Sequence, residues 1–480
     1  MRLIDDFLNN ITMYRLVLYF LILLAGVGLI YSIAGVLPFD PINYAFSFTF
    51  LIVIAGIANK VFAKVYGAHA NVESWIISAL ILGLIIAPPK SLHDVIFLGW
   101  AAVLMVTSKF VLTIGKKHIF NPVAISVAVT AFAIGASADW WVGVSSMLPI
   151  VAIGGLLIVR KIKRWDLVLS FLVVALLLTG PARWARSVSD TPLIFFAAVM
   201  LTEPLTTPPT KTLRILYGAL VGLLFAPQVH FGSIYTTPEL ALIIGNIFSY
   251  IVSPKYKLVL TLKQKIQLAP DIFDFVFIPD KRINFTPGQY MEWTLEHEKS
   301  DSRGNRRYLS LASSPTEQEV RVGVKIGSPP SSFKRSLVNL MPGQKIVAGQ
   351  LIGDFRLPKD LKKKLVFIAG GIGITPYRSM IKYIIDTSQK RDVILMYSAK
   401  EGDFVYKDVF DQARYKLGIK TYYNVGRFQE NFILKEVPDY KERIFYLSGP
   451  KSLVDGFTKV LRDLKIPHSQ IKTDYFPGFA

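Results

Sequence analysis

The sequence predicts a multi-domain protein of two unlike parts: a polytopic α-helical membrane domain, followed by an antiparallel β-barrel and an α/β doubly wound domain. Residues 14–252 hold one apolar run after another, whereas residues 254–480 carry Lys, Asp and Glu throughout. In the second part, alternation with a period of two gives way to apolar strands separated by helical patterns. We place the domains at 1–253, 254–358 and 359–480.

The composition limits the possible functions. The chain has 480 residues, of which 52% are hydrophobic, and a mean hydropathy of +0.42, too apolar for one soluble globule. It contains no cysteine, which excludes disulfides and cysteine-ligated zinc or iron–sulfur sites, and we expect no metal site. The net charge is +20. No internal repeat is visible.

About ten membrane spans are expected, because a spanning helix needs roughly 20 mostly apolar residues, or fewer where neighbours shield its ends. The expected spans are 16–37, 42–63, 74–88, 92–110, 119–136, 142–159, 166–180, 192–202, 214–230 and 237–252. The ranges 74–88 and 192–202 are short, which makes them candidates for broken or re-entrant helices.

The distribution of Lys and Arg predicts the topology. With the N-terminus inside, fifteen Lys and Arg residues fall in the inside loops, against only Lys90, Arg183 and Arg186 outside. The soluble part then lies on the cytoplasmic side of a multi-pass protein of the cell inner (cytoplasmic) membrane, surrounded by membrane lipid. This bias accounts for much of the positive charge, and we expect no nucleic-acid partner.

The barrel is predicted from alternating segments at 257–262, 273–278 and 320–326, separated by Pro- and Gly-containing turns. A further strand carries the segment Arg307-Tyr308-Leu309-Ser310-Leu311-Ala312-Ser313, and the turn Phe285-Thr286-Pro287-Gly288-Gln289-Tyr290 precedes it. An Arg can pair with a diphosphate and a Ser hydroxyl can bond a flavin ring nitrogen, although such side chains on a strand are usually only solvated.

In the α/β domain, the apolar strand 365–369 leads into Ala369-Gly370-Gly371-Ile372-Gly373-Ile374-Thr375-Pro376 and a helix. Glycines permit close backbone approach and a helix N-terminus favours phosphate, although the pattern also occurs in plain strand–turn–helix connections. Leu447-Ser448-Gly449-Pro450 ends a later strand of the same sheet, and open α/β sheets bind ligands at strand ends.

Taken together and in this order, these segments and an aromatic C-terminal tail resemble the ferredoxin–NADP⁺ reductase family over about 225 residues. The resemblance implies an FAD-binding barrel at 254–358, an NAD(P)-binding domain at 359–480, and an NAD(P)H-dependent flavin oxidoreductase. The cofactor-binding residues it implies are Tyr290, Arg307, Tyr308, Leu309, Ser310, Ser331, Ser332, Gly370, Gly371, Gly373, Thr375, Pro376, Gly449, Pro450, Phe476 and Phe479. Ser310 and Ser448 are the implied catalytic residues of this part.

Two positions depart from the family's pattern. Leu309 stands where an aromatic residue is usual, so that ring stacking passes to Tyr308 or Tyr290. Ser448 replaces a frequent Cys before Gly-Pro, which removes any thiol role. The choice between NADH and NADPH stays open, since Ser398 and Lys400 suit a 2′-phosphate and Glu401 suits a ribose hydroxyl.

The membrane part is similar to the D subunit of the Rnf complex and the B subunit of sodium-translocating NADH:quinone reductase. The resemblance rests on Lys117-His118-Ile119-Phe120-Asn121-Pro122 and on the segment 201–207 with Lys211 and Tyr217-Gly218-Ala219-Leu220. It implies Asn121, Thr206 and Thr207 as candidates for a second, non-covalent FMN or riboflavin, and Glu203 as a catalytic candidate. The flavin-attachment loop of those subunits is missing between Asn121 and Ile150. Glu203 paired with Lys211, and Asn121 as a helix cap, are the structural alternatives.

The preferred function is transfer of electrons from NAD(P)H through FAD to a second flavin or a quinone in the membrane domain, with possible coupling to ion translocation. Further subunits or a homo-oligomer are compatible with it. One alternative is a haem-containing ferric reductase or NADPH oxidase-like enzyme, for which the histidines of the first half are poorly spaced. Another is a membrane transporter or scaffold whose reductase-like module senses redox state.

Overall fold

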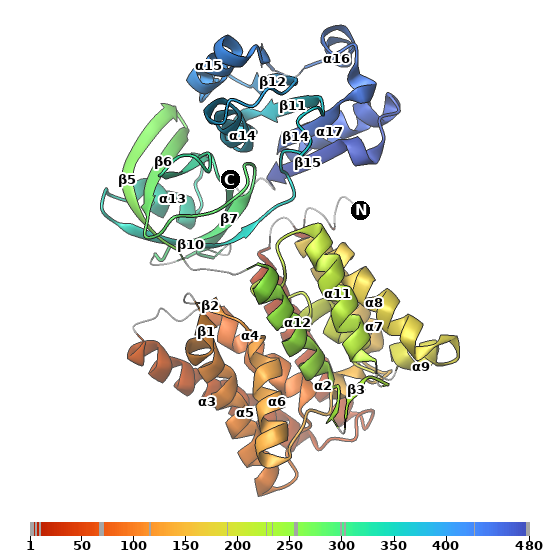
Figure 1. Ribbon diagram of the computed structural model, residues 1–480. Helices are drawn as coiled ribbons and strands as arrows, with labels where there is room; N and C mark the ends of the chain where they lie inside the picture. Colours follow the sequence, from red (N-terminus) through yellow and green to blue (C-terminus); the bar gives the residue numbers. More distant parts are fainter. Residues whose placement is uncertain are drawn as a thin grey trace. The chain divides into compact units, whose positions relative to one another are not determined.

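The computed structural model describes the chain except for residues 1–3, 5–6, 9–10, 67–71, 115–116, 190, 227, 233, 254–257, 298–299, 302–303, 427 and 477–480. The chain divides into two compact units, Met1–Tyr256 and Lys257–Ala480 (Figure 1).

The N-terminal unit is a helical bundle, with a described helix in each of the ten places where an apolar run predicts a span. These helices are α2 (Met13–Ile33), α3 (Pro41–Val65), α4 (Val72–Ile85), α5 (Leu92–Val111), α6 (Pro122–Ile134), α7 (Leu148–Ile162), α8 (Trp165–Thr179), α10 (Leu193–Phe195) with the π-helical turn η3 (Phe196–Met200), α11 (Lys211–Phe225) and α12 (Pro238–Val252). The shorter elements are η1 (Trp141–Gly143), η2 (Pro181–Arg183), α9 (Trp184–Ser189), and the hairpins β1 (Thr113–Ile114)–β2 (Lys117–His118) and β3 (His230–Phe231)–β4 (Ile234–Tyr235).

Three of the described helices, α2, α3 and α5, are long and apolar enough to cross a membrane by themselves. A fourth crossing is added if α8 and Pro181–Ser189, which are bent by 102°, form one span. The remaining helices are shorter than the roughly 20 residues that a bilayer requires. Length and composition therefore support three or four crossings among the described residues, and the expected number of ten is not shown.

The order of elements in this unit repeats, although no repeat is visible in the sequence. Four helices, a short hairpin and a fifth helix occur twice, first from α2 to α6 and then from α7 to α12, when the short elements η2 and α9 are left aside and α10 with η3 is counted as one helix. In each half the second helix packs against the fourth and the fourth against the fifth. Both fifth helices begin with a side-chain cap followed by proline, at Asn121–Pro122 and Thr237–Pro238. Figure 1 shows the hairpins at opposite ends of the unit, so that the halves run in opposite directions.

The first part of the C-terminal unit is an antiparallel six-stranded sheet with the order β8-β7-β10-β5-β6-β9. Its elements are β5 (Leu258–Ala269), β6 (Ile272–Pro279), β7 (Tyr290–Thr294), β8 (Arg306–Ser310), β9 (Val320–Lys325), α13 (Ser332–Asn339) and β10 (Lys345–Ile352). Alternate side chains of β5 and β9 are buried in one core with Phe275, Phe277 and Trp293. The predicted antiparallel sheet is confirmed.

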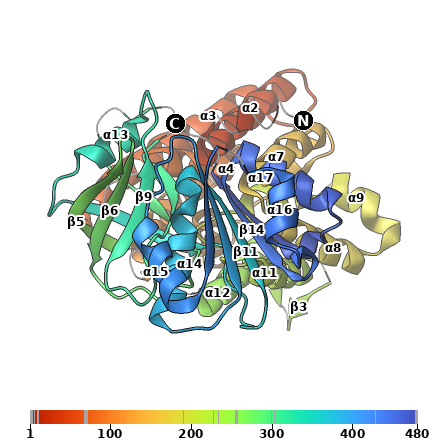
Figure 2. The same ribbon diagram turned by 90° about the horizontal axis from the view of Figure 1, so that it is seen from above.

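The second part is a parallel five-stranded sheet with the order β13-β12-β11-β14-β15. Its elements are β11 (Leu365–Gly370), η4 (Gly371–Ile374), α14 (Thr375–Asp386), β12 (Val393–Ala399), α15 (Lys407–Leu417), β13 (Lys420–Val425), α16 (Glu430–Glu436), η5 (Tyr440–Glu442), β14 (Ile444–Pro450), α17 (Lys451–Asp463), η6 (His468–Gln470) and β15 (Ile471–Phe476). Helices α14 and α15 cover one face and α16 and α17 the other (Figures 1 and 2). The strand order reverses between β11 and β14, which is where such sheets bind ligands.

Candidate functional site

The edge strand β8 separates the predicted flavin residues between its two faces. Ser310 and Tyr308 lie opposite Tyr290 and Glu292 of β7, whereas Leu309 lies opposite Met291 in the barrel core. The rings of Tyr308 and Tyr290 meet edge to face, with centroids 5.8 Å apart. The two aromatic residues expected to replace the missing ring at Leu309 therefore lie together beside Ser310.

Arg307 lies on the other face of β8 and reaches helix α13. Its guanidinium carbon is 5.1 Å from the centre of the Phe333 ring, and one nitrogen donates to the Gly304 carbonyl at 3.2 Å. The neighbouring Ser331 caps α13 by accepting from the Lys334 N–H. The structure thus brings the predicted diphosphate residues Arg307, Ser331 and Ser332 to one helix N-terminus, where backbone N–H groups favour a phosphate.

The glycine segment after β11 allows two backbones to approach closely. A Cβ on Gly373 would lie 2.5 Å from the Gly449 Cα and 2.5 Å from the Ser448 carbonyl oxygen, so no larger residue fits there. Gly371 has a φ of +53°, and no atom lies within 4 Å of where its Cβ would be. The predicted residues Gly370, Thr375, Pro376 and Pro450 flank this contact, which leaves open space in front of Gly371 for a nucleotide.

The two predicted catalytic hydroxyls, of Ser310 and Ser448, are both buried. Ser310 is 3% exposed and Ser448 is fully buried, and neither Oγ has a hydrogen-bond partner among the described residues. A buried hydroxyl without a partner costs free energy. Both lie at the ends of strands that carry the flavin and nucleotide segments, so these residues fit a bound FAD with its nicotinamide partner.

In the N-terminal unit, the Glu203 carboxylate accepts hydrogen bonds from groups in both halves of the bundle. The donors are Asn121 Nδ2 at 3.0 Å and Thr206 Oγ1 at 3.2 Å, and His118 Nε2 lies at 3.3 Å. Glu203 follows the π-helical turn η3, a kind of distortion that often occurs at functional sites. Asn121 is also the cap of α6, as the structural alternative predicts, because its Oδ1 accepts from two backbone N–H groups at 3.1 Å.

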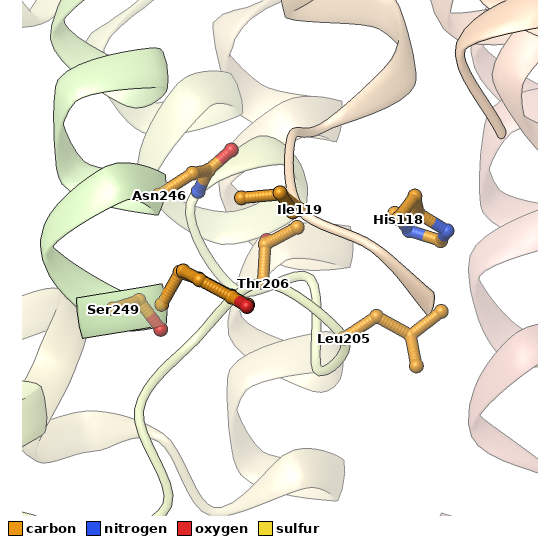
Figure 3. Close-up of a pocket in the computed structure, with 7 residues that line it drawn as sticks. His118, Ile119, Leu205, Thr206, Asn246 and Ser249 are labelled. Atoms are coloured by element: carbon orange, nitrogen blue, oxygen red, sulfur yellow. The ribbon is translucent and has the colours of Figure 1, made fainter. Parts of the chain in front are cut away.

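A small pocket lies beside this cluster. It is lined by His118, Ile119, Leu205, Thr206, Asn246, Ser249 and Tyr250 (Figure 3). Ser249 is 1% exposed and its Oγ has no hydrogen-bond partner among the described residues. Asn246 bonds the Asn121 N–H at 2.7 Å and the Tyr217 hydroxyl at 3.0 Å. Thr207, the remaining candidate, is buried next to Thr206.

Two residues beside the predicted diphosphate site, His297 and Asp301, were not predicted from the sequence. Ser332 Oγ accepts from the Asp301 N–H at 2.9 Å and bonds His297 Nε2 at 2.9 Å, and neither partner belongs to a recognisable motif. Of the two predicted aromatic residues of the tail, Phe476 ends β15, where its backbone lies opposite Pro450 of β14, and Phe479 lies outside the described residues. No group of His, Asp and Glu suited to a metal ion occurs in the described ranges.

Comparison with known proteins places the similarity in the C-terminal unit. Residues 367–458 match the family described as oxidoreductase NAD-binding domain. A flavohemoprotein of Oceanobacillus iheyensis is 27% identical over 235 residues, which are 44% of this chain and 57% of that protein. An NADPH oxidoreductase of Mycobacterium tuberculosis is 28% identical over 187 residues, 37% of this chain and 48% of that protein. The chain thus spans about half the length of these relatives.

Among solved structures, the flavohem-like FAD/NAD-binding domain of a nitric oxide dioxygenase from Vibrio cholerae aligns with a TM-score of 0.41 and 21% identity, covering 45% of this chain and 98% of that one. The family match at residues 367–458 contains the glycine segment after β11 and the Ser448–Pro450 segment of the site. These matches identify an NAD(P)H-dependent flavin oxidoreductase part of the chain, with FAD and NAD(P)H as its cofactors.

Proposed function

We propose that the protein is a membrane-bound oxidoreductase that passes electrons from NAD(P)H through FAD to an acceptor bound in its helical unit. The observation that carries the reductase half is the burial of the Ser310 and Ser448 hydroxyls, which have no hydrogen-bond partner in the part of the chain that the structure describes. Bound FAD supplies the conversion between two-electron hydride chemistry and onward electron transfer. The chain's own residues bind and orient: Arg307 and α13 take the diphosphate, and Gly371 leaves room for the nucleotide.

The pocket beside Glu203 supports the acceptor half. It is polar where Ser249 and Asn246 line it and apolar where Ile119 and Leu205 line it, and Glu203 holds donors from both halves of the bundle. Polar groups at membrane depth are costly, which makes them functional candidates. This mixture of polar and apolar side chains is the kind of lining that a quinone ring, or a non-covalent FMN or riboflavin, would require. The resemblance to the Rnf D and NADH:quinone reductase B subunits supports the same site. From that resemblance we also propose ten membrane crossings, a reductase unit on the cytoplasmic side, and coupling of electron transfer to ion transport.

The haem alternative is disfavoured by where two histidines lie. His118 is on β2 and His230 is on β3, and these hairpins lie at opposite ends of the N-terminal unit (Figure 1). The two side chains therefore cannot ligate one haem.

The deciding experiment is the absorbance spectrum and acid-released flavin content of the purified full chain, followed by NAD(P)H oxidation with quinone or ferricyanide. We expect a flavin spectrum without a Soret band, and turnover with both acceptors. Bound FAD without turnover on any acceptor would favour a redox sensor joined to a transporter or scaffold. A folded protein without flavin would refute the proposal.

A further inference from the structure

Helix α14 begins at the nucleotide loop (Gly371–Thr375). Two of its side chains form hydrogen bonds to the segment that follows strand β8. Arg378 is 3% exposed and one of its guanidinium nitrogens donates to the Ala312 carbonyl at 2.7 Å. The next residue, Ser379, is fully buried and its hydroxyl donates to the Ser313 carbonyl at 2.6 Å. Consecutive side chains of α14 thus bind consecutive carbonyls two and three residues beyond Ser310.

Glu317 completes this connection. Its two carboxylate oxygens accept from the two terminal nitrogens of Arg378 at 2.9 and 3.0 Å, and one of them also accepts from the Ser314 N–H at 2.6 Å. Burial alone raises the pKa of Glu317, but the bonds from Arg378 hold that pKa below its ordinary value. A paired, two-pronged contact of this kind fixes orientation as well as distance.

Arg378 also packs against Tyr406, which is in turn bonded to the barrel strand β6. Its guanidinium carbon lies 5.4 Å from the centre of the Tyr406 ring, and the Tyr406 hydroxyl bonds Asp274 of β6 at 3.0 Å. Arg321 of β9 lies 3.4 Å from the same carboxylate. The Tyr406 hydroxyl is also 2.7 Å from where a Cβ on Gly323 would lie, and Thr375 Oγ1 is 3.1 Å from that point. These contacts join the barrel to the start of the nucleotide-binding helix.

A second buried Arg–carboxylate pair, Arg443 with Asp392, occurs in the C-terminal unit and does not contact the flavin or nucleotide segments among the described residues. Arg443 is 5% exposed, binds Asp392 through two nitrogens at 2.8 and 2.9 Å, and donates to the Leu365 carbonyl at 3.3 Å. Leu365 is the first residue of β11, at the end of the strand remote from the nucleotide loop. Arg443 therefore provides a matched control for a buried Arg–carboxylate pair.

We propose that Arg378, together with Glu317, is a positioning residue that sets the distance between the flavin-binding strand end at Ser310 and the nucleotide loop at Gly371–Thr375. This inference rests on the proposed function of the C-terminal unit. The step concerned is transfer of a hydride, which oxidises the reduced nicotinamide and reduces the flavin by two electrons. Misplacement of the reacting groups by about 1 Å can slow such a step roughly a hundredfold, although neither Arg378 nor Glu317 touches a reacting atom.

The test uses the full chain in detergent with FAD bound. Three variants are compared: Arg378→Met; the charge-neutral double variant Arg378→Met with Glu317→Gln, which leaves no buried unpaired charge; and the control Arg443→Met. For each we would measure FAD content, hydrogen exchange of residues 311–321, the Kd for NAD⁺ or NADP⁺, and the rate of anaerobic flavin bleaching by NAD(P)H. Hydrogen exchange reports on the connection itself, independently of activity.

In both Arg378 variants we expect retained FAD, exchange of residues 311–321 at least about tenfold faster, and flavin bleaching slowed about tenfold or more at saturating nucleotide. The Kd for the nucleotide should change little. In Arg443→Met, exchange of residues 311–321 and bleaching should match the wild type. Unchanged exchange and bleaching in the double variant, or equal losses in the control, would overturn the inference. A wild-type protein that is not bleached by NAD(P)H would instead refute the proposed function.

Discussion

Asn121 Nδ2 donates a hydrogen bond of 3.0 Å to Glu203 Oε2, which links the cap of α6 in the first half of the bundle to the loop after η3 in the second half. The same asparagine accepts, through Oδ1, the first N–H groups of α6. One side chain therefore both starts a helix and holds a carboxylate of the opposite half. This double role makes the Glu203 pocket a junction between the two halves.

Glu203→Gln should leave ferricyanide reduction intact and impair electron delivery to quinone, because the amide keeps the shape but loses the charge that organises Asn121, Thr206 and His118. The measurement compares NAD(P)H oxidation with the two acceptors in the purified full chain. Glu239→Gln is the control: Glu239 is a more deeply buried carboxylate at the N-terminal end of α12, where it accepts a hydrogen bond from Trp140 Nε1 at 2.6 Å. Equal loss of both activities would indicate misfolding, and loss of neither would make Glu203 a structural residue.

Arg307→Ala should lower FAD affinity about tenfold or more, since a charge-assisted bond to a diphosphate contributes roughly 1.5–3 kcal/mol. Fluorescence titration of the flavin-free protein with FAD measures the Kd. Arg306→Ala is the matched control: Arg306 is the neighbouring residue on the same strand and faces Glu292 at 3.5 Å. Equal affinities in the two variants would mean that Arg307 does not contact the diphosphate.

Gly371→Ala and Gly373→Ala should affect different properties: the first should weaken nucleotide binding, and the second should lower the stability of the fold. Alanine at 371 meets no protein atom but must adopt a φ of +53°, which costs roughly 1 kcal/mol, and its methyl group enters the proposed nucleotide space. We expect a folded protein with a raised KM for NAD(P)H. Alanine at 373 would meet backbone atoms at 2.5 Å, so Tm should fall strongly. Differential scanning fluorimetry and steady-state kinetics separate the two effects; a reversed pattern would contradict the assignment of the space before Gly371.

Asp439 should contribute to stability only above strongly acidic pH. The hydrogen bond from Arg443 is the main cause that lowers the pKa of Asp439 from 3.8 to about 2. Because the folded-state pKa is the lower one, the stabilisation is complete above about pH 4 and is lost as the pH falls toward 2. The Tm difference between wild type and Asp439→Asn, followed by FAD release on heating, should be nearly constant above pH 4, shrink as the pH falls toward 2 and disappear below that pH. A Tm difference that grows as the pH falls would refute the predicted direction of this pH dependence.

The fragment Lys257–Ala480 should fold by itself, bind FAD and reduce ferricyanide with NAD(P)H. It coincides with one compact unit, and the predicted FAD and nicotinamide nucleotide residues all fall within it. Circular dichroism and flavin content after gel filtration are the measurements. A soluble, folded fragment without flavin would refute the assignment of this unit as an FAD-binding reductase module.

The sequence by itself determined the order of elements that local patterns specify. Alternation predicted β5, β6 and β9, and apolar runs marked β11, β12 and β14, because burial of a strand face depends on residues two apart. The apolar runs of the first half likewise predicted where the helices lie. Motif order was sufficient to place Arg307, Ser310 and Gly371 in a reductase-like module.

Only the tertiary structure decided which distant residues meet. The partners of Arg378 are 61 and 66 residues away, and those of Glu203 up to 85, so no local pattern could indicate them. The repeat in the helical unit was invisible because its halves share an order of elements and caps rather than a sequence. The helix lengths depend on where caps and prolines begin and end each helix. By these lengths and by composition, three or four of the described helices can cross a membrane. Long-range packing and hydrogen bonding determine these features, since they depend on contacts that form only when the chain is folded.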